Sequence, residues 1–267
     1  MQLIYGFLLG AAIGALAWRA GSLSASGVFG ATLTGGLVFG LGGLPWAVLL
    51  LAFFISSSAL SRILAARKSV LTEKFSKGAQ RDLGQVLANG GLAALLVVIF
   101  ELNGKPIWAW VAFAGCMAAV TADTWATEIG VLGRAAPRLI TSGRVVEKGT
   151  SGAISKTGNL ALFGGAGMIG LIASLFSFPG SFPGVLLAAT LGGVSGALFD
   201  SFLGASFQAI YTCPTCQKET ERHPLHSCGS ETVHLRGWKW MNNDWVNFAC
   251  SAVGAGVAAG VWLVFFQ

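Results

Sequence analysis

Two acidic residues stand at the end of a long apolar segment, within the stretch TADTWATEIG at residues 121–130. The preceding residues, IWAWVAFAGCMAAV, carry no charge, and Asp123 and Glu128 follow them in the same helical pattern. Carboxylates are costly in a bilayer, and by default they mark a functional site there. The two side chains would be about 140° apart around a helix. Either they line two walls of one crevice, or Glu128 lies beyond a local break in the helix.

Other acids are expected at the same depth in the membrane. A helix that enters near Ile107 reaches Asp123 after about 25 Å, and the same count from Pro183 places Asp200 at that level. Clustered carboxylates suit a hard cation, and Mg²⁺ binds through one or two of them together with substrate phosphates. The alternative is that single acids cap helices or pair with arginines. We predict as catalytic residues Asp123, Glu128, Asp200 and Asp244, of which Asp123, Asp200 and Asp244 would bind magnesium.

Amide side chains accompany the acids at the start of two other apolar segments. Gln85 and Asn89 follow Asp82 at helical spacing, and Asn247 lies one turn after Asn243. Carboxylates combined with amides suit a cation that also carries phosphate ligands. The substrate-binding residues that we predict here are Asp82, Asn89, Asn243 and Asn247.

The stretch EKGTSGAISKTGN at residues 147–159 leads into another apolar segment. A helix start rich in Gly, Ser and Thr presents free backbone N–H groups and the positive end of the helix dipole, which together form an anion site. The spacing of glycine and lysine is not that of a Walker motif, and a flexible basic loop would have a similar composition. The phosphate-binding residues that we predict are Arg144, Lys148, Gly149, Thr150, Ser151, Gly152 and Lys156.

A cysteine-rich segment follows at residues 211–237. The pair Cys213 and Cys216 precedes His226 and Cys228, and these four side chains would complete a tetrahedral zinc site like that of a small zinc ribbon. His223 is the alternative to His226. A disulfide is disfavoured if the segment faces the reducing cytosol. Because all four positions would be protein ligands, we expect a structural Zn²⁺ ion.

The elements that must position these residues are membrane helices. The chain is 54% hydrophobic and only 10% charged, whereas soluble domains average about 25% charged. All basic residues except Lys105 lie in alternate loops, including Arg67, Lys68, Lys74 and Lys77. This pattern indicates membrane orientation rather than binding to nucleic acid, and it places these loops in the cytosol and both termini outside. We expect about eight spans, at residues 2–18, 27–43, 45–62, 83–101, 107–130, 157–178, 183–208 and 246–266.

Several segments echo one another in the same order. LSASGVFGATLTGG at 23–36 resembles GTSGAISKTGNLALFGG at 149–165, and RDLGQVLANGG at 81–91 resembles NDWVNFACSAVG at 243–254. We predict an all-α polytopic protein with two parallel four-helix repeats, related by an axis along the membrane normal. The repeats are residues 1–102 and 103–267, and residues 211–237 form a cytosolic zinc-binding insertion. Chance similarity among helices rich in small residues is the alternative.

The motifs ADTWATEIG, KGTSGAIS, GALFDSFLGASFQ, RGWKWMNNDWVN and RDLGQVLANGG occur in this order over nearly the whole chain. Together they resemble the integral membrane family long labelled domain of unknown function ninety-two, which includes the plant phytyl-phosphate kinases of vitamin E synthesis. The resemblance implies a kinase in a bacterial inner membrane that uses Mg²⁺ and a nucleoside triphosphate, expected to be CTP. The acceptor would be a prenyl monophosphate, and the active site would face the cytosol. A lipid cytidylyltransferase and a lipid or solute transporter are the alternatives, and the oligomeric state stays open.

Overall fold

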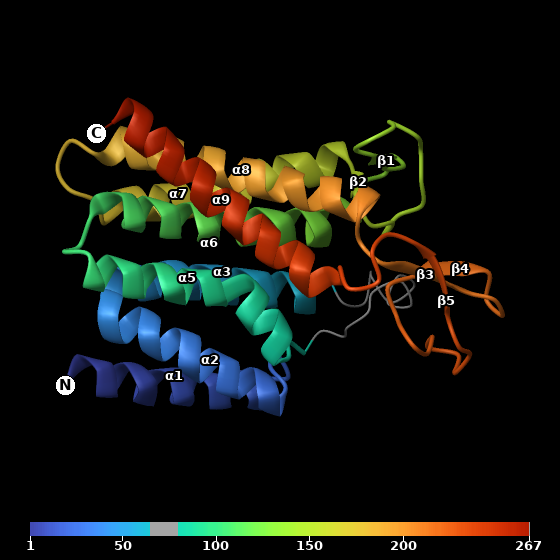
Figure 1. The fold of residues 1–267 in the computed structure, drawn as a ribbon, viewed down its shortest axis with the longest axis horizontal. Helices are drawn as coiled ribbons and strands as arrows, with labels where there is room; N and C mark the ends of the chain where they lie inside the picture. Colours follow the sequence, from blue (N-terminus) through green and yellow to red (C-terminus); the bar gives the residue numbers. More distant parts are fainter. Residues whose placement is uncertain (65–79, 267) are drawn as a thin grey trace.

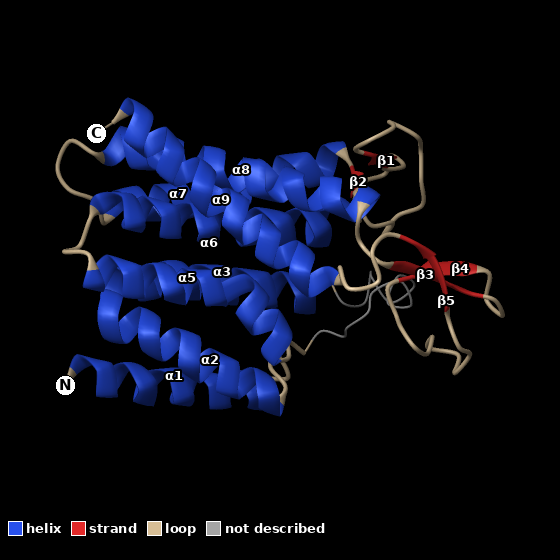
Figure 2. Ribbon diagram, in the orientation of Figure 1, coloured by secondary structure: helices blue, strands red, loops and turns tan. Residues whose placement is uncertain are grey.

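The computed structural model describes residues 1–64 and 80–266, and it confirms a helical membrane protein. Among the described residues, eight helical segments are long and apolar enough to span a bilayer. They run side by side, and both chain termini lie at the end opposite two small sheets (Figures 1 and 2). The segments are α1 (Gln2–Arg19), α2 (Ala25–Leu37) with a π-helical turn η1 (Val38–Gly42), α3 (Leu44–Ile63), α5 (Leu83–Leu102), α6 (Ile107–Gly130), α7 (Lys156–Leu175), α8 (Phe182–Ser206) and α9 (Asn243–Phe265).

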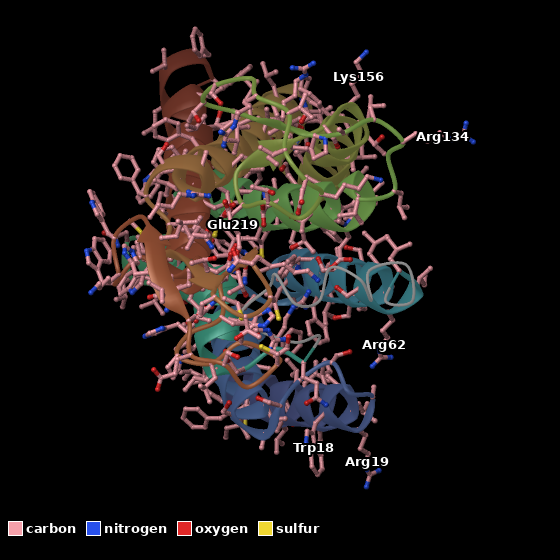
Figure 3. All side chains as sticks on the ribbon, turned by 90° about the vertical axis from the view of Figure 1, so that its right-hand side faces the viewer. Trp18, Arg19, Arg62, Arg134, Lys156 and Glu219 are labelled. Carbon is pink, nitrogen blue, oxygen red and sulfur yellow. The ribbon has the colours of Figure 1, made fainter. Side chains whose placement is uncertain are left out.

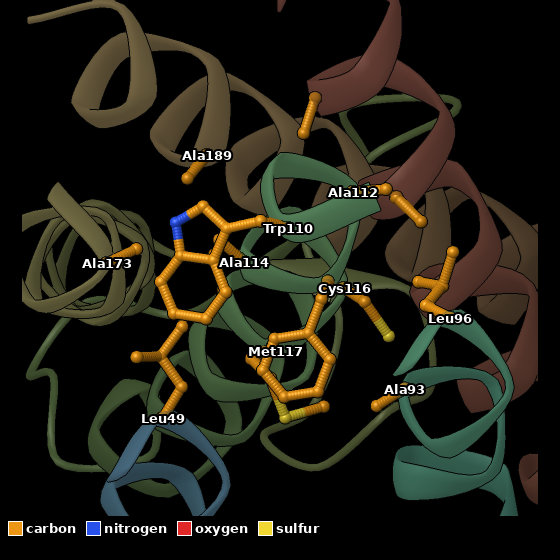
Figure 4. Close-up of a cluster of buried hydrophobic side chains, with 14 of the residues drawn as sticks. Leu49, Ala93, Leu96, Trp110, Ala112, Ala114, Cys116, Met117, Ala173 and Ala189 are labelled. Atoms are coloured by element: carbon orange, nitrogen blue, oxygen red, sulfur yellow. The ribbon is translucent and has the colours of Figure 1, made fainter. Parts of the chain in front are cut away.

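The centre of the bundle is α6. In its most apolar window 78% of the residues are buried, against 22% for α1. Its aromatic side chains pack on neighbouring helices, so that the rings of Trp46 and Phe113 lie 4.6 Å apart. Figure 4 shows Leu49, Trp110 and Met117 gathered in this core. Residues 109–122 of α6 are all buried, whereas the polar residues that follow, from Asp123 on, are only partly covered apart from Glu128.

Small residues bring α6, α8 and α9 into close contact. A Cβ on Gly196 of α8 would lie 2.6 Å from the Cβ of Ala119 on α6 and 2.6 Å from the carbonyl oxygen of Cys250 on α9. Helix interfaces in membranes commonly use such small residues. α6 and α8 run in the same direction, so residues one turn beyond this contact also face each other. Those residues are Asp123, four after Ala119, and Asp200, four after Gly196.

The peripheral helix α1 is held in a similar way. Its buried residues Gly6, Gly10 and Gly14 recur at every fourth position, and they face α2 and η1. A Cβ on Gly6 would lie 2.6 Å from the carbonyl oxygen of Gly36. The two halves of the chain are packed differently, because α6 is central in the second half whereas α1 lies at the edge of the first. The duplication into residues 1–102 and 103–267 stays a prediction.

Two antiparallel sheets lie at one end of the bundle, which we call the sheet end (Figure 2). The smaller sheet pairs β1 (Arg138–Leu139) with β2 (Ala153–Ile154). The larger sheet has the order β4-β3-β5 and comprises β3 (Ile210–Cys213), β4 (Lys218–Thr220) and β5 (Val233–Arg236). It forms the zinc-ribbon-like segment expected at residues 211–237.

Basic side chains gather at the sheet end. Arg19, Arg62, Arg134 and Lys156 project outward around its edge in Figure 3. Arg67, Lys68, Lys74 and Lys77 belong to the predicted basic loops but lie outside the described residues.

Candidate functional site

A polar cavity of about 400 Å³ opens at the sheet end. Its walls come from α3, α5, α6, the loop before α7, the first turns of α7 and α9, the end of α8 and the residues after β4. It collects residues that lie far apart in the sequence. The predicted site residues that line it are Asn89, Asp123, Glu128, Lys148, Gly149, Thr150, Ser151, Gly152, Asp200, Asn243 and Asn247.

Asp123 and Asp200 form an acidic pair in the wall of the cavity. The close approach of α6 and α8 brings their carboxyl groups into direct interaction. The Oδ2 atom of Asp200 is buried and has no hydrogen-bond partner among the described residues. Two carboxyl groups this close either share a proton, or both stay ionised because a cation lies between them. The pair is therefore suited to binding a cation.

Glu221 is a third acid at this place, and the sequence analysis did not find it. It directly follows β4, and its charge acts on both Asp123 and Asp200. The side-chain amide of Gln208 donates to Glu221 Oε1 at 2.9 Å, and Ser151 Oγ donates to Gln208 Oε1 at 2.5 Å. These contacts connect the predicted phosphate loop, the segment before α7 that contains Ser151, to the larger sheet. The only signal in the sequence was an acidic residue shortly after the Cys-x-x-Cys pair.

Glu128 lies on another wall of the same cavity. α6 continues without a break to Gly130. Glu128 therefore does not lie beyond a helix break, and Asp123 and Glu128 line two walls of one cavity. Glu128 is buried, and Ser61 Oγ donates to its Oε1 at 2.8 Å. Arg81 lines the cavity nearby. Burial lowers the pKa of Arg81 to about 10 while the charge of Glu128 acts in the opposite direction, so the guanidinium is positive at neutral pH.

The predicted phosphate loop, residues 147–155, forms another part of the cavity wall. Lys148 Nζ donates to the carbonyl oxygens of Val131 at 3.1 Å and Gly133 at 2.6 Å, which fixes the loop to the end of α6. Ser155 caps α7 by accepting a hydrogen bond from the backbone N–H of Gly158. Gly158 also lines the cavity. The first turn of α7 thus presents the positive end of a helix dipole to this space.

Gly152 is required for the shape of this loop. Its φ is +79°, and an added Cβ would overlap the backbone of Ala205 at the end of α8. We expect Gly152→Ala to lower the free energy of unfolding by about 1–3 kcal/mol, which thermal-shift measurements in detergent would detect. Gly143→Ala is the matched control, because Gly143 has φ +67° but open space around it. Equal shifts for the two variants would mean that contact with α8 does not matter.

Four of the predicted catalytic and substrate-binding residues do not line the cavity. Asp82 is the N-cap of α5 and accepts a hydrogen bond from the backbone N–H of Gln85 at 2.9 Å. It therefore caps a helix, which was the alternative expected for a single acid. Asp244 lies in the first turn of α9. Arg144 is exposed, and Lys156 projects into solvent at the edge of the sheet end (Figure 3). Periodicity placed these residues at the correct end of the bundle, but it did not determine which face of each element they occupy.

Cys213, Cys216, His226 and Cys228 come together at the larger sheet. Their ligand atoms all lie within 4.8 Å of one another. The Sγ atoms of Cys213 and Cys228 are 3.6 Å apart, close to the roughly 3.8 Å edge of a tetrahedron with Zn–S bonds of about 2.3 Å. Hydrogen bonds from Ser230 and, to a smaller extent, from His226 lower the pKa of Cys228 to about 5. This favours the thiolate form that binds metal.

His226 rather than His223 belongs to this cluster. His226 Nδ1 lies 3.3 Å from Cys228 Sγ. The ring of His223 instead stacks on Tyr211, with centroids 4.4 Å apart. The three thiols and one imidazole therefore fit a structural zinc ion with four protein ligands.

The fold and the site define a polytopic membrane protein with a carboxylate-lined cavity beside a zinc-ribbon-like segment. The chain belongs to the family described as integral membrane protein DUF92, whose model matches residues 8–255. This match confirms the resemblance that the motifs indicate.

Curated relatives extend over most of the chain. It is 31% identical over 269 residues to Protein PGR of Arabidopsis thaliana, covering 92% of this chain and 91% of that protein. It is 38% identical over 188 residues to an uncharacterized membrane protein of Methanocaldococcus jannaschii, covering 70% and 75%. It is 27% identical over 246 residues to the chloroplastic protein VTE6 of Arabidopsis thaliana, covering 88% and 64%. No solved structure matches the chain significantly.

Proposed function

We propose that this protein is a membrane-embedded kinase that transfers a phosphoryl group from a nucleoside triphosphate to a prenyl monophosphate, giving the diphosphate. CTP is the expected donor. One observation carries the proposal: Asp123, Asp200 and Glu221 converge in a cavity that the phosphate loop and the first turn of α7 also line. Membership of a family that includes plant phytyl-phosphate kinases supports a prenyl monophosphate as the acceptor.

The acidic side fits a magnesium ion. Carboxylate oxygens are the ligands that Mg²⁺ prefers, and the buried Oδ2 of Asp200 lacks a hydrogen-bond partner among the described residues. Asp123 and Asp200 would hold the ion, with Glu221 beside them. Bound there, Mg²⁺ would neutralise the charge of the nucleotide phosphates during transfer.

The phosphate loop and the start of α7 would position the phosphates. Backbone N–H groups of the phosphate loop and of the first turn of α7 would bind the nucleotide's phosphate oxygens. Arg81 and Arg222 line the cavity and add positive charge. An acceptor phosphate oxygen is already ionised near neutral pH and can attack directly, so the reaction needs no general base. Catalysis would then rest on positioning and charge neutralisation.

The proposed location is a bacterial inner membrane. The proposed orientation places the sheet end in the cytosol. Basic residues gather at that end, and loops rich in Lys and Arg stay on the cytoplasmic side. This orientation gives the cavity access to nucleotides and leaves the zinc segment in a reducing compartment.

The test is an assay of purified protein in detergent with phytyl or geranylgeranyl monophosphate, Mg²⁺ and each of the four nucleoside triphosphates. The lipids would be analysed by mass spectrometry. We expect a prenyl diphosphate with at least one donor, most strongly with CTP. A nucleotidyl-lipid product would assign the protein as a cytidylyltransferase. If folded protein turned over no donor, the kinase proposal would be rejected in favour of transport.

A further inference from the structure

A second, apolar pocket adjoins the polar cavity inside the first half of the bundle. Its volume is about 90 Å³, and its walls come from α1, α2, η1, α3 and α5. Three residues line both spaces, namely Arg81, Gln85 and Asn89. The two pockets therefore meet along one side of α5, where polar side chains give way to apolar ones.

Missing side chains create this apolar space. Gly35 on α2 and Gly90 on α5 line it, and a Cβ at either position would find its nearest neighbour at 3.8 Å. The π-helical turn η1 contributes Phe39 to the wall. Isolated π-helical turns occur frequently at functional sites because they change which side chains face inward.

Arg81 stands at the junction between the two spaces. Its guanidinium lies over the rings of Phe53 at 5.4 Å and Phe54 at 5.6 Å, and both rings line the apolar pocket. Cation–π contacts of this kind keep a charged group at the edge of an apolar region. A ligand with an anionic head and a hydrocarbon tail matches a polar cavity that adjoins an apolar pocket. Its head would lie at Arg81 and its tail beyond the phenylalanines.

We propose that the prenyl chain of the lipid phosphate substrate occupies this apolar pocket, with its phosphate held at Arg81, Gln85 and Asn89. The inference rests on the proposed function and specifies where the acceptor lies. The nucleotide then occupies the opposite part of the polar cavity, between the acids and the phosphate loop. The residues that bind the acceptor belong to the first half of the chain, whereas the acids and the phosphate loop belong to the second.

The pocket also lies close to the bilayer. Leu9 of α1 lines it and is 43% exposed, so this one side chain separates the pocket from the lipid-facing surface at α1. A chain longer than the pocket leaves along this helix. Part of the prenyl chain thus remains in lipid while the phosphate stays in the polar cavity.

A photoreactive substrate analogue tests the proposal without requiring turnover. The probe is geranylgeranyl monophosphate with a diazirine on the isoprene unit next to the phosphate, bound to the full chain in nanodiscs without nucleotide. We expect labelling of pocket residues such as Phe39, Leu50 and Phe54. We expect Gly90→Leu to reduce this labelling about tenfold, since excluding roughly two methylene groups from burial costs about one decade of affinity.

The matched control is Gly91→Leu. Gly91 neighbours Gly90 on α5, but it does not line the pocket, and its added Cβ would contact only Leu87 of the same helix. Labelling should stay at the wild-type level in this variant. Gly35→Leu fills the same pocket from α2, and it replaces Gly90→Leu as the test variant if Gly90→Leu does not fold.

Two results would overturn the proposal. One is unchanged labelling in the folded pocket-filling variants. The other is competition by phosphatidylglycerol as effective as that by unlabelled geranylgeranyl monophosphate, which would make the pocket a site for ordinary membrane lipid. Turnover by the wild-type protein is measured separately, so loss of the kinase function and loss of the tail site are distinguished. Pocket labelling in a protein without turnover would support the lipid site and reject only the kinase.

Discussion

Replacement of Asp123 or Asp200 by asparagine is expected to lower kinase turnover by about 100- to 1,000-fold or more while the protein stays folded. Each variant keeps the shape of the side chain but removes one of the two charges that face each other between α6 and α8. A preorganised charge in a site that excludes water contributes about this much to catalysis. The measurement is prenyl diphosphate formation in detergent at saturating Mg²⁺ and nucleotide.

Glu101→Gln provides the control for this substitution. Glu101 lies near the C-terminal end of α5, away from the sheet end, and pairs with Lys105 at 3.3 Å. The control variant should keep wild-type turnover. Size-exclusion profiles and thermal midpoints would establish that all three variants are folded. Wild-type rates in both Asp123→Asn and Asp200→Asn would remove the metal-cluster proposal.

The sequence predicted the membrane helices closely because a bilayer constrains them strongly. Backbone groups must be satisfied within each span, and about 20 apolar residues are needed to cross. The expected span at residues 107–130 coincides with α6, and that at 83–101 differs from α5 by one residue. The meeting of Asp123 and Asp200 could also be anticipated, since equal depth in two parallel helices follows from counting residues.

The sequence could not predict contacts that depend on the larger sheet. Glu221 reaches the cavity only because β4 folds back along β3, which returns the chain to Gln208 just beyond the end of α8. Asp244 failed to reach it for a related reason, because depth along α9 does not determine the direction in which a side chain points. The pocket between α2, α3 and α5 was equally hidden, since its apolar lining has the same composition as a lipid-facing surface.

Loss of the zinc site is expected to lower the proposed kinase activity through Glu221. Cys213 ends β3, which pairs with β4, and Glu221 directly follows β4. Without metal the turn between β3 and β4 loses its link to the loop after β4 that carries His226 and Cys228. Glu221, which begins that loop, then shifts away from Asp123 and Asp200. We expect Cys213→Ser to lower bound zinc from about one ion per chain to a small fraction. We also expect kcat/KM to fall about 10- to 100-fold, as when a residue that orients a metal site is lost.

A double-mutant cycle separates this route from general loss of structure. Glu221→Gln alone should cause a similar fall in kcat/KM while zinc content stays at the wild-type level. If the zinc site acts by positioning Glu221, the variant with both substitutions should be little worse than either single one. Ser227→Ala is the control, because Ser227 lies between His226 and Cys228 but is exposed and outside the ligand set. Additive losses would instead mean that the zinc segment supports the cavity by a path that does not include Glu221. In that case Arg222, which also follows β4 and lines the cavity, becomes the residue to substitute next.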